Sequence, residues 1–490
     1  MKLSLIGHNY KYELEKLIRI FLPFEKIEFC DDEDFTENCA ITKCHIVDNN
    51  VQLIAKLNLN GKTADFSDSI LNNCDDFNKE CERLLAVQLY KCFVKITGYG
   101  APWGILTGVR PAKLYSRLAL ALGEENADSY FLNKLLVSKE KLEICKESVK
   151  GEEKIISLSK PDSFSLYISI PFCPTRCTYC SFVSHSVKQA KKLIPQYVNL
   201  LCEELIETAK IVKQCNLTLE TVYIGGGTPT SIDAELIQKI MTTVSENFSL
   251  ENVREYTVEA GRPDTITKDK LLAIKNGGAT RISINPQTMN DDVLKNIGRN
   301  HDSKQTADAF KLARSCGFNN INMDLIAGLP GDTIDSFDNT LSKVISLNPE
   351  SITVHSLSVK RASTLNSTES TDILMDGITA SKMVLSAKER LTQNGIFPYY
   401  MYRQSKTVGN LENVGYAKKG YEGLYNVYIM DETHSILACG ASAVTKLREP
   451  NGAFIDRIFN FKYPYEYIDR FGEIIERKKN ICDFYNKYFH

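Results

Sequence analysis

The chain has 490 residues, of which 43% are hydrophobic and 24% charged, a globular composition that excludes disordered and fibrous classes. Lysine and arginine number 59 against 61 aspartate and glutamate residues, a net charge of -2. A general nucleic-acid binder would need a basic surplus or stripe, so we expect no nucleic-acid partner. No stretch approaches about 18 consecutive apolar residues, and no membrane span is predicted.

The amino-terminal segment reaches His8, Lys11 and Glu13 before the apolar core of a signal peptide could form. We therefore expect a cytoplasmic protein. Of the 15 cysteines, most stand singly and are expected to be small buried hydrophobes in a reducing cell. Three of them cluster, and these carry the functional argument below.

Residues 1–160 predict an α+β domain of unknown role. Alternation in KLSLIGH and EKIEFC predicts strands on either side of a helix in YELEKLIRIFL. ITKCHIVDN and VQLIAKLNL flank Asn49-Asn50, which predicts a hairpin turn. A helix is expected at about 75–97, and further helical segments run to a Pro-containing boundary at 159–163.

Residues 161–375 show a regular alternation of β-branched strands and amphipathic helices. The strands are predicted in FSLYISI, TVYIGG, EYTVEA, TRISINP, NINMDLIAG and SITVHSL, and the helices at 190–213, 231–247, 267–276, 303–316 and 334–347. Six βα-type repeats imply a parallel α/β sheet with right-handed crossovers, either open and doubly wound or closed into a full or partial barrel. Residues 376–490 predict a long helix at 376–395, strand-like pieces in FPYYMY, YNVYIM and SILACG, and a helical tail.

Three cysteines follow directly on the first strand of this series. Cys173, Cys177 and Cys180 have the spacing C-x3-C-x2-C. A closed zinc site usually takes four ligands from two paired spacings, whereas three soft thiolates suit a [4Fe–4S] cluster with one iron left open. The carboxyl end of a strand is also where α/β proteins place their ligands. We therefore predict an iron–sulfur cluster on this loop.

Polar or side-chain-free positions end the following strands. Each alone is typical of a tight turn or a solvated loop. Together, at one end of a barrel, they predict a polar site for a zwitterion and a sugar. They are Gly225, Gly226, Gly227 and Thr228 after the second strand, Glu259 on the third, Gln287 and Arg299 after the fourth, and Asp324 on the fifth.

These motifs resemble a known family. The cysteine loop, with Tyr179 before its last cysteine and GGGTP after it, resembles the radical S-adenosylmethionine (SAM) superfamily. The companion motifs resemble the oxygen-independent coproporphyrinogen III oxidase/dehydrogenase group, most closely its HemZ-type branch, over roughly residues 160–445. They are Y-x-S-x-P-F-C from Tyr167, VEAGRPDT, RISINPQT, IGRNH and NMDLIAGLPG.

The resemblance implies a partial (β/α)6 barrel and roles for individual residues. The three cysteines would bind three irons, and the amino and carboxylate groups of SAM would chelate the fourth. Tyr167, Tyr179 and the backbone near Phe182 would contact SAM, the last two against the adenine. The remaining contacts would be Gly226, Gly227 and Thr228 at the amino group, Glu259 and Gln287 at ribose or amino groups, Arg299 at the carboxylate, and Asp324 at the ribose.

The implied reaction converts coproporphyrinogen III to protoporphyrinogen IX in anaerobic haem biosynthesis. One electron enters SAM from the reduced cluster, and the resulting 5′-deoxyadenosyl radical removes a β-hydrogen from a propionate. Loss of carbon dioxide and one further electron leaves a vinyl group. The implied partners are a tetrapyrrole and a flavodoxin- or ferredoxin-type electron donor. Candidate propionate anchors, or ordinary surface charges, are Lys360, Arg361 and Arg403.

Two positions depart from the well-characterised oxidases of the family. Ser169 replaces a histidine, and Phe182 replaces a further cysteine. A phenylalanine at the position of Phe182 resembles the related haem-chaperone branch. The signature H-N-x-x-Y-W of that branch is, however, incomplete in this chain. The comparable stretch reads YNVYIM, and Trp103 is the only tryptophan. The alternatives are therefore a haem-binding chaperone, or a SAM-dependent enzyme that methylates or opens the porphyrin ring.

Overall fold

The computed structural model describes residues 1–72, 76–180, 185–358, 370–404, 406–450, 452 and 454–489. Its contacts form two compact units. The first comprises Met1–Lys146, Ser367–Ser381 and Tyr402–Glu412, and the second comprises Glu147–Asn366, Lys382–Met401 and Asn413–His490. The division at 1–160, 161–375 and 376–490 stays a prediction.

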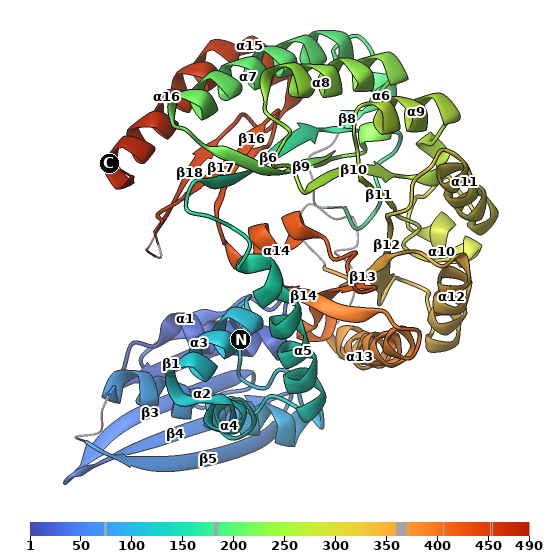
Figure 1. The fold of residues 1–490 in the computed structure, drawn as a ribbon. Coiled ribbons are helices and arrows are strands. Elements are labelled where there is room, and N and C mark those ends of the chain that lie inside the picture. The colour runs from blue at the N-terminus through green and yellow to red at the C-terminus, as the bar shows by residue number, and fades with distance from the viewer. Residues whose placement is uncertain are drawn as a thin grey trace. The chain divides into compact units, whose positions relative to one another are not determined.

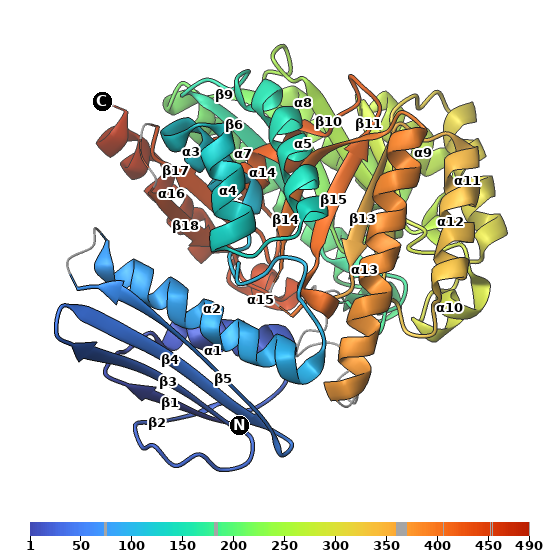
Figure 2. The ribbon, with the colours of Figure 1, turned by 90° about the horizontal axis from the view of Figure 1, so that it is seen from below.

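The first unit contains a five-stranded sheet in the order β2-β1-β3-β4-β5. The strand β1 is parallel to β2 and β3, whereas β3, β4 and β5 form antiparallel hairpins. Figure 2 shows α1 and α2 on one face of this sheet, where Phe21 and Phe93 stack with their ring centroids 4.6 Å apart. The elements are β1 Lys2–Ile6, α1 Lys11–Phe21, β2 Glu28–Cys30, β3 Cys39–Val47, β4 Asn50–Leu59, β5 Lys62–Leu71 and α2 Phe77–Thr97.

Each hairpin turns on two residues, and each turn contains at least one residue in the left-handed region. The first turn is Asp48-Asn49 rather than the predicted Asn49-Asn50, because Val47 pairs with Asn50 and Asp48 has a φ of 55°. The strand β5 was not predicted, since KTADFSDSIL is polar. Its position follows from the tight turn at Asn60-Gly61, with φ values of 50° and 76°, which continues β4 directly into an antiparallel partner.

Arg403 belongs to the interior of the first unit. Its guanidinium donates to the carbonyl oxygens of Leu106 at 2.6 Å and Gly108 at 3.2 Å, and lies over the ring of Trp103. It is therefore neither a surface charge nor an open propionate anchor. Lys360 and Arg361 lie outside the described residues. The other helices of this region are α3 Pro111–Leu122, α4 Glu124–Ser129, the π-helical turn Tyr130–Lys134 and α5 Lys139–Ile156.

The second unit confirms the predicted partial (β/α)6 barrel. Its sheet has the order β14-β15-β13-β12-β11-β10-β9-β6-β16-β17-β18, and the six strands from β13 to β6 are mutually parallel. Figure 1 shows the helices α7, α8, α9, α11 and α12 around the outside of these strands. The strands are β6 Ser163–Ile170, β9 Thr218–Gly226, β10 Glu255–Gly261, β11 Arg281–Ile284, β12 Ile321–Ala327 and β13 Ser351–Ser356.

The helices between these strands carry the amphipathic pattern that the sequence predicts. Each turns a buried apolar stripe toward the sheet, as α8 does with Ile237, Ile240 and Val244. The helices are α7 Ile194–Gln214, α8 Ala234–Asn247, α9 Lys268–Asn276, α10 Asp291–Asn296, α11 Ser303–Ser315 and α12 Ile334–Leu347, and α13 Ser370–Gln393 follows the last of these strands. None of the helices in the described ranges combines the length and apolar composition needed to cross a membrane.

The segment predicted as a strand in YNVYIM is a helix, α14 Leu424–Asp431. Its first backbone N–H groups donate to the carboxylate of Glu255, Leu424 at 2.8 Å and Tyr425 at 3.3 Å. A carboxylate at a helix N-terminus satisfies donors that would otherwise lack partners and interacts favourably with the helix dipole. The strand-like composition is thus overridden by a tertiary cap from β10.

The carboxyl-terminal helices cover the barrel beside α7. Lys478 on α16 lies 3.1 Å from the Glu204 carboxylate on α7, and both side chains are buried. Glu204 also accepts hydrogen bonds from Tyr467, Asn460 and the backbone of Gly440. The remaining elements are β14 Phe397–Arg403, β15 Glu412–Ala417, β16 Ser435–Cys439, β17 Val444–Arg448, β18 Ile455–Phe459, α15 Pro464–Asp469 and α16 Phe471–Tyr488.

Candidate active site

The cysteine loop leaves the carboxyl end of β6 and is held by backbone contacts. Cys173 lies on the short strand β7 Phe172–Cys173, which pairs with β8 His185–Ser186. Cys180 N donates to Cys177 O at 3.1 Å, which makes a tight turn between the second and third cysteines. The loop is also fixed from outside, because Thr178 N donates to Ile297 O at 3.1 Å at the end of α10.

The glycine segment after β9 lies against this loop. A Cβ added to Gly227 would stand 2.6 Å from Phe172 O and 3.0 Å from Cys173 Sγ. Thr228 N donates to Phe172 O at 2.8 Å, and its hydroxyl lies 3.5 Å from Cys173 Sγ. Gly226 has a φ of 112°, which strongly favours glycine. The close approach of two backbone segments therefore requires the glycines that the motif supplies.

Arg262, which the sequence reasoning missed, lies beside the second cysteine. Its Nη1 is 3.8 Å from Cys177 Sγ and donates to the Thr175 hydroxyl at 2.8 Å. A two-point contact with the Asp264 carboxylate, at 3.0 and 2.9 Å, fixes the guanidinium. Burial would raise the pKa of Asp264, but His301 and Arg262 hold it well below its usual range. An arginine just past the end of β10, within GRPD, was the available signal.

The donor set fits a multi-iron cluster. The loop offers three half-buried thiols, with the guanidinium of Arg262 3.8 Å from the second sulfur. Within the described residues, no three His, Cys, Asp or Glu side chains converge to hold a single metal ion. In a cubane cluster each thiolate binds a separate iron, so its ligands need not converge.

Arg299 provides an unpaired, buried donor near the same loop. Its Nη2 donates to the Tyr179 hydroxyl at 2.9 Å and its Nη1 to Asn285 O at 3.4 Å. Its Nε is buried without a partner. A buried guanidinium with a vacant N–H is suited to an incoming carboxylate. Tyr179 and Arg299, both predicted SAM contacts, are therefore brought together.

The fourth strand delivers Gln287 in a strained conformation. Gln287 has a φ of 70°, a backbone conformation that residues other than glycine rarely adopt. Its backbone is locked to β12, since Gln287 N donates to Asp324 O and Ile326 N donates to Gln287 O, each at 3.0 Å. Such over-determined strain is concentrated at functional sites.

Glu259 on β10 and Asp324 on β12 carry carboxyl groups that interact electrostatically. Burial, together with the nearby Asp324 carboxylate, raises the pKa of Glu259 to about 7, although a hydrogen bond from the Tyr223 hydroxyl lowers it. Burial would also raise the pKa of Asp324, but His355 and Asn322 hold it below its ordinary value. His355 Nε2 lies 3.8 Å from Asp324 Oδ2, and Asn322 donates to Asp324 Oδ1 at 2.7 Å.

Three tyrosines fill the inner face below these carboxylates. The ring of Tyr223 stacks on that of Tyr425 with the centroids 4.3 Å apart, and Tyr167 stacks 6.2 Å from each. Tyr167, a predicted SAM contact, thus lies in a tyrosine stack that also carries the partner of Glu259. The predicted contact near Phe182 falls outside the described residues.

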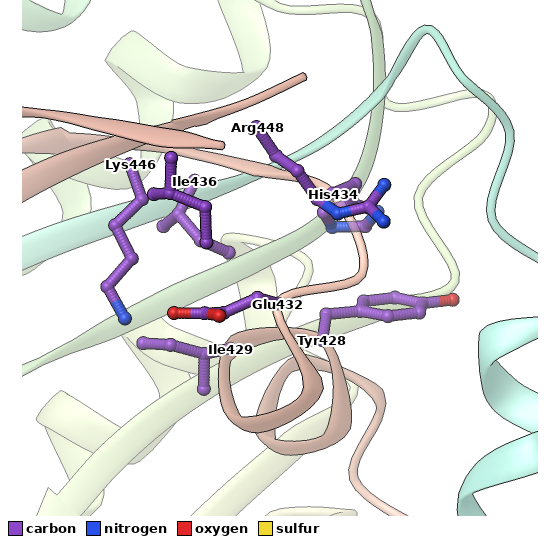
Figure 3. A pocket seen from close by; sticks show the side chains of 8 residues that line it. Tyr428, Ile429, Glu432, His434, Ile436, Lys446 and Arg448 are labelled. Carbon is purple, nitrogen blue, oxygen red and sulfur yellow. The ribbon is translucent and has the colours of Figure 1, made fainter. Parts of the chain in front are cut away.

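A small hollow lies at the opposite edge of the barrel from the cysteine loop. Figure 3 shows it beside the start of β16, lined by residues such as Glu432, His434, Lys446 and Arg448. His434 is held between the hydroxyls of Ser159 and Ser165, each at 2.7 Å, and burial lowers its pKa to about 3. A neutral, fully engaged histidine has a structural role, and the hollow is separate from the carboxyl-edge site.

Comparisons with known proteins agree with this geometry. The sequence model of the Radical SAM superfamily matches residues 167–344. The chain is 38% identical over 386 residues to the oxygen-independent coproporphyrinogen-III oxidase-like protein HemZ of Bacillus subtilis, covering 78% of this chain and 77% of that one. It thus belongs to the radical SAM superfamily and, within it, to the oxygen-independent coproporphyrinogen-III oxidase-like family of HemZ. Its cofactors are a [4Fe–4S] cluster and SAM.

Two further relatives differ in function by name. The heme chaperone HemW of Bacillus subtilis is 38% identical over 197 residues, which are 40% of this chain and 51% of that protein. The solved coproporphyrinogen III oxidase HemN of Escherichia coli shares the fold, with a TM-score of 0.50, 24% identity and coverage of 65% of this chain and 71% of the other. The comparisons therefore include both an oxidase and a chaperone.

Proposed function

We propose that the chain is an oxygen-independent coproporphyrinogen III oxidase, which converts propionate side chains to vinyl groups and yields protoporphyrinogen IX. The observation that carries the proposal is the carboxyl-edge site itself. There the cysteine loop, the unpaired Nε of Arg299 and the Glu259 and Asp324 carboxylates occupy successive strand ends. Similarity to HemZ over most of both chains supports this substrate class.

In this proposal the chain's own residues bind and orient the cofactors. Cys173, Cys177 and Cys180 hold three irons, and Arg262 places a positive charge beside the sulfur of Cys177. Arg299 presents its free N–H to the SAM carboxylate, and Tyr179 holds the guanidinium in place. When bound, the reduced cluster and SAM supply a radical that abstracts a hydrogen atom.

The inner face supplies acceptors for the rest of SAM. Glu259, as the ionised carboxylate, accepts hydrogen bonds from amino or hydroxyl groups, and Asp324 accepts them from the ribose. The tyrosine stack of Tyr167, Tyr223 and Tyr425 excludes water beneath these groups. Each propionate loses one hydrogen atom, carbon dioxide and one electron, and so becomes a vinyl group.

A haem-binding chaperone is the second candidate, favoured by the similarity to HemW. The stretch comparable to the chaperone signature is the helix α14, with Tyr425 stacked into the barrel and the carboxylate of Glu255 at its N-terminus. Neither histidine nor tryptophan stands there. In this chain the stretch packs inside the barrel through Tyr425 and Glu255 and lacks the chaperone signature, which favours the enzyme over the chaperone.

One anaerobic incubation separates the candidates. Reconstituted, reduced protein is mixed with SAM and coproporphyrinogen III, and the products are analysed by mass spectrometry. We expect the incubation to form carbon dioxide, a vinyl-bearing tetrapyrrole and 5′-deoxyadenosine, with the three products increasing together. Stable stoichiometric haem binding with an unchanged tetrapyrrole mass would reject the oxidase and support the chaperone. S-adenosylhomocysteine with methylated tetrapyrrole would instead indicate a methyltransferase.

A further inference from the structure

The segment around the cysteine loop has an unusual charge distribution. Between Ser163 and Cys202 the chain contains no aspartate or glutamate, although the whole chain has a net charge of -2. The same segment contains Arg176, Lys188, Lys191 and Lys192. The stretch of sequence that follows the cysteine loop is therefore basic in a slightly acidic protein.

The three lysines lie immediately beyond β8, which pairs with the strand of Cys173. Lys188 is on the short helix α6 Val187–Ala190, and Lys191 and Lys192 follow in the turn before α7. All three are exposed, and none forms an ion pair with a carboxylate in the described part of the chain. Because α6 contacts both β7 and β8, this charge lies beside the cysteine loop.

Aromatic side chains from the carboxyl-terminal segment lie against the same two strands. His185, opposite Phe172 in the β7–β8 pair, makes edge contacts with Tyr463 and Tyr465 at 6.0 and 6.1 Å between ring centroids. The two tyrosines stack on each other at 5.4 Å, and Tyr465 is 45% exposed. A fourth lysine, Lys462, lies 5.8 Å from the centroid of the Tyr463 ring.

The proposed function requires an electron from outside the chain. Each hydrogen abstraction consumes one electron that the cluster has received, and that electron enters near the cysteine loop. Transient redox encounters use small interfaces of under about 1,200 Å² and depend on charge steering for their association rates. A few exposed cations around an exposed aromatic residue match this kind of interface.

We propose that Lys188, Lys191, Lys192, Lys462 and Tyr465 form the docking surface for an acidic one-electron carrier protein that reduces the cluster. The inference rests on the proposed binding of the cluster by the cysteine loop. The carrier is oxidised by one electron, the cluster is reduced by one, and no atom is transferred. Four lysines on two segments that meet at His185 are a small set of cations, and Glu466 lies beside Tyr465, whereas a nucleic acid needs an extended basic stripe.

The first test measures cluster reduction by stopped-flow absorbance under anaerobic conditions. The reductant is an acidic plant-type ferredoxin, reduced beforehand. We expect K188E/K191E to slow the bimolecular rate by about tenfold at low ionic strength, with the difference fading at high salt. The control K311E/K419E makes the same charge change on exposed lysines of α11 and the segment after β15, and is expected to match the wild type.

Reduction by dithionite separates the failure of this inference from failure of the proposed function. A cluster that assembles and is reduced normally by dithionite, but whose reduction by ferredoxin is equally fast in both double variants, overturns the docking surface alone. A protein that holds no cluster overturns the cysteine assignment instead. The rate of cluster reduction does not depend on the tetrapyrrole reaction.

Zero-length cross-linking of carboxylates to lysines tests the surface directly. With ferredoxin and the holoprotein we expect cross-links at Lys188, Lys191, Lys192 or Lys462, and their loss above about 0.5 M salt, where charges are screened over a few ångströms. Cross-links confined to other lysines would overturn the proposal. The proposal would also be overturned if a short RNA protected these lysines from chemical modification and ferredoxin did not.

Discussion

The Nη1 of Arg262 lies 3.8 Å from the sulfur of Cys177, and its other nitrogens are held by the carboxylate of Asp264. This contact brings a fixed positive charge from the end of β10 to a loop that leaves β6. Charges and hydrogen bonds beside the sulfurs are among the features that set the potential of an iron–sulfur cluster. We therefore expect Arg262 to influence the potential of a cluster held by this loop.

Arg262→Gln is expected to make the cluster potential more negative, because a positive charge favours the reduced, more negative state. A change of a few tens of millivolts is expected, 59 mV being tenfold in a one-electron equilibrium. Redox titration followed by electron paramagnetic resonance measures it. Arg281→Gln removes another buried arginine, one that donates to Ser351 on β13, and should lower stability without moving the potential. Equal potentials in both variants would remove Arg262 from this role.

Replacing Cys173, Cys177 and Cys180 together with alanine is expected to abolish cluster binding. The reconstituted wild type should hold about four irons and four sulfides per chain, and the variant close to none. Iron and sulfide analysis with visible absorbance gives the result. The matched control replaces the half-buried Cys215, Cys316 and Cys482, and should retain a full cluster. Unchanged iron in the first variant would refute the assignment.

SAM affinity is expected to rise with pH through about 7, the pKa to which burial raises Glu259. We expect only the ionised carboxylate of Glu259 to accept hydrogen bonds from SAM with both of its oxygens. The affinity for SAM should therefore increase about tenfold between pH 6 and pH 8. Calorimetric titration measures this profile. Glu259→Gln should flatten it. Tyr223→Phe should move it to higher pH, because the Tyr223 hydroxyl lowers this pKa. A flat profile in the wild type would contradict the role.

The carboxyl group of Glu259 should also make the stability of the cofactor-free chain depend on pH, but here stability falls as the pH rises. The folded pKa lies above the ordinary value of 4.5, so the native state binds this proton more tightly than the unfolded state. The contribution to stability is thus present below about pH 4.5 and lost as the pH rises through 7. Glu259→Gln should therefore gain relative stability at pH 8 in urea unfolding.

Arg299→Ala is expected to weaken SAM binding by about 2–5 kcal/mol, since a buried carboxylate would lose its partner. Arg299→Lys keeps the charge but not the fork geometry, and should recover only part of the loss. Calorimetry on folded, cluster-loaded variants measures both. Tyr179→Phe removes the hydroxyl that accepts from Nη2 and should have a smaller effect. Wild-type affinity in Arg299→Ala would reject the role.

Lys478→Ala is expected to destabilise the second unit by about 3–5 kcal/mol, because it leaves the buried Glu204 carboxylate without its cation. Lys478→Met fills the same space and should cost no less while Glu204 stays charged, whereas combining it with Glu204→Gln should recover stability. The neighbouring Lys479→Ala, at a side chain 67% exposed, should change stability by under about 0.5 kcal/mol. Urea unfolding measures the free energy of unfolding of each variant. Equal losses in Lys478→Ala and Lys479→Ala would contradict a stabilising role of the buried Lys478–Glu204 pair.

The periodicity of the sequence determined the six parallel strands and the helices between them. Strands such as FSLYISI and helices such as α12 agree with their local patterns, because alternating β-branched runs and amphipathic repeats are local signals. The cysteine spacing and the glycine segment were likewise readable, since each depends on a few neighbouring residues. That is why the fold and the superfamily could be predicted from the chain alone.

Only the tertiary structure decided which distant residues meet. The strand-like YNVYIM became α14 because Glu255, about 170 residues earlier, accepts its first N–H groups. Tyr223 contacts Glu259 because β9 pairs with β10, and Arg262 contacts Cys177 because β9 joins β10 to β6, and no local pattern contains either contact. Arg403, polar by composition, became buried because three backbone carbonyls accept from it. Long-range caps and charge pairs depend on strand register and burial, which a local pattern does not contain.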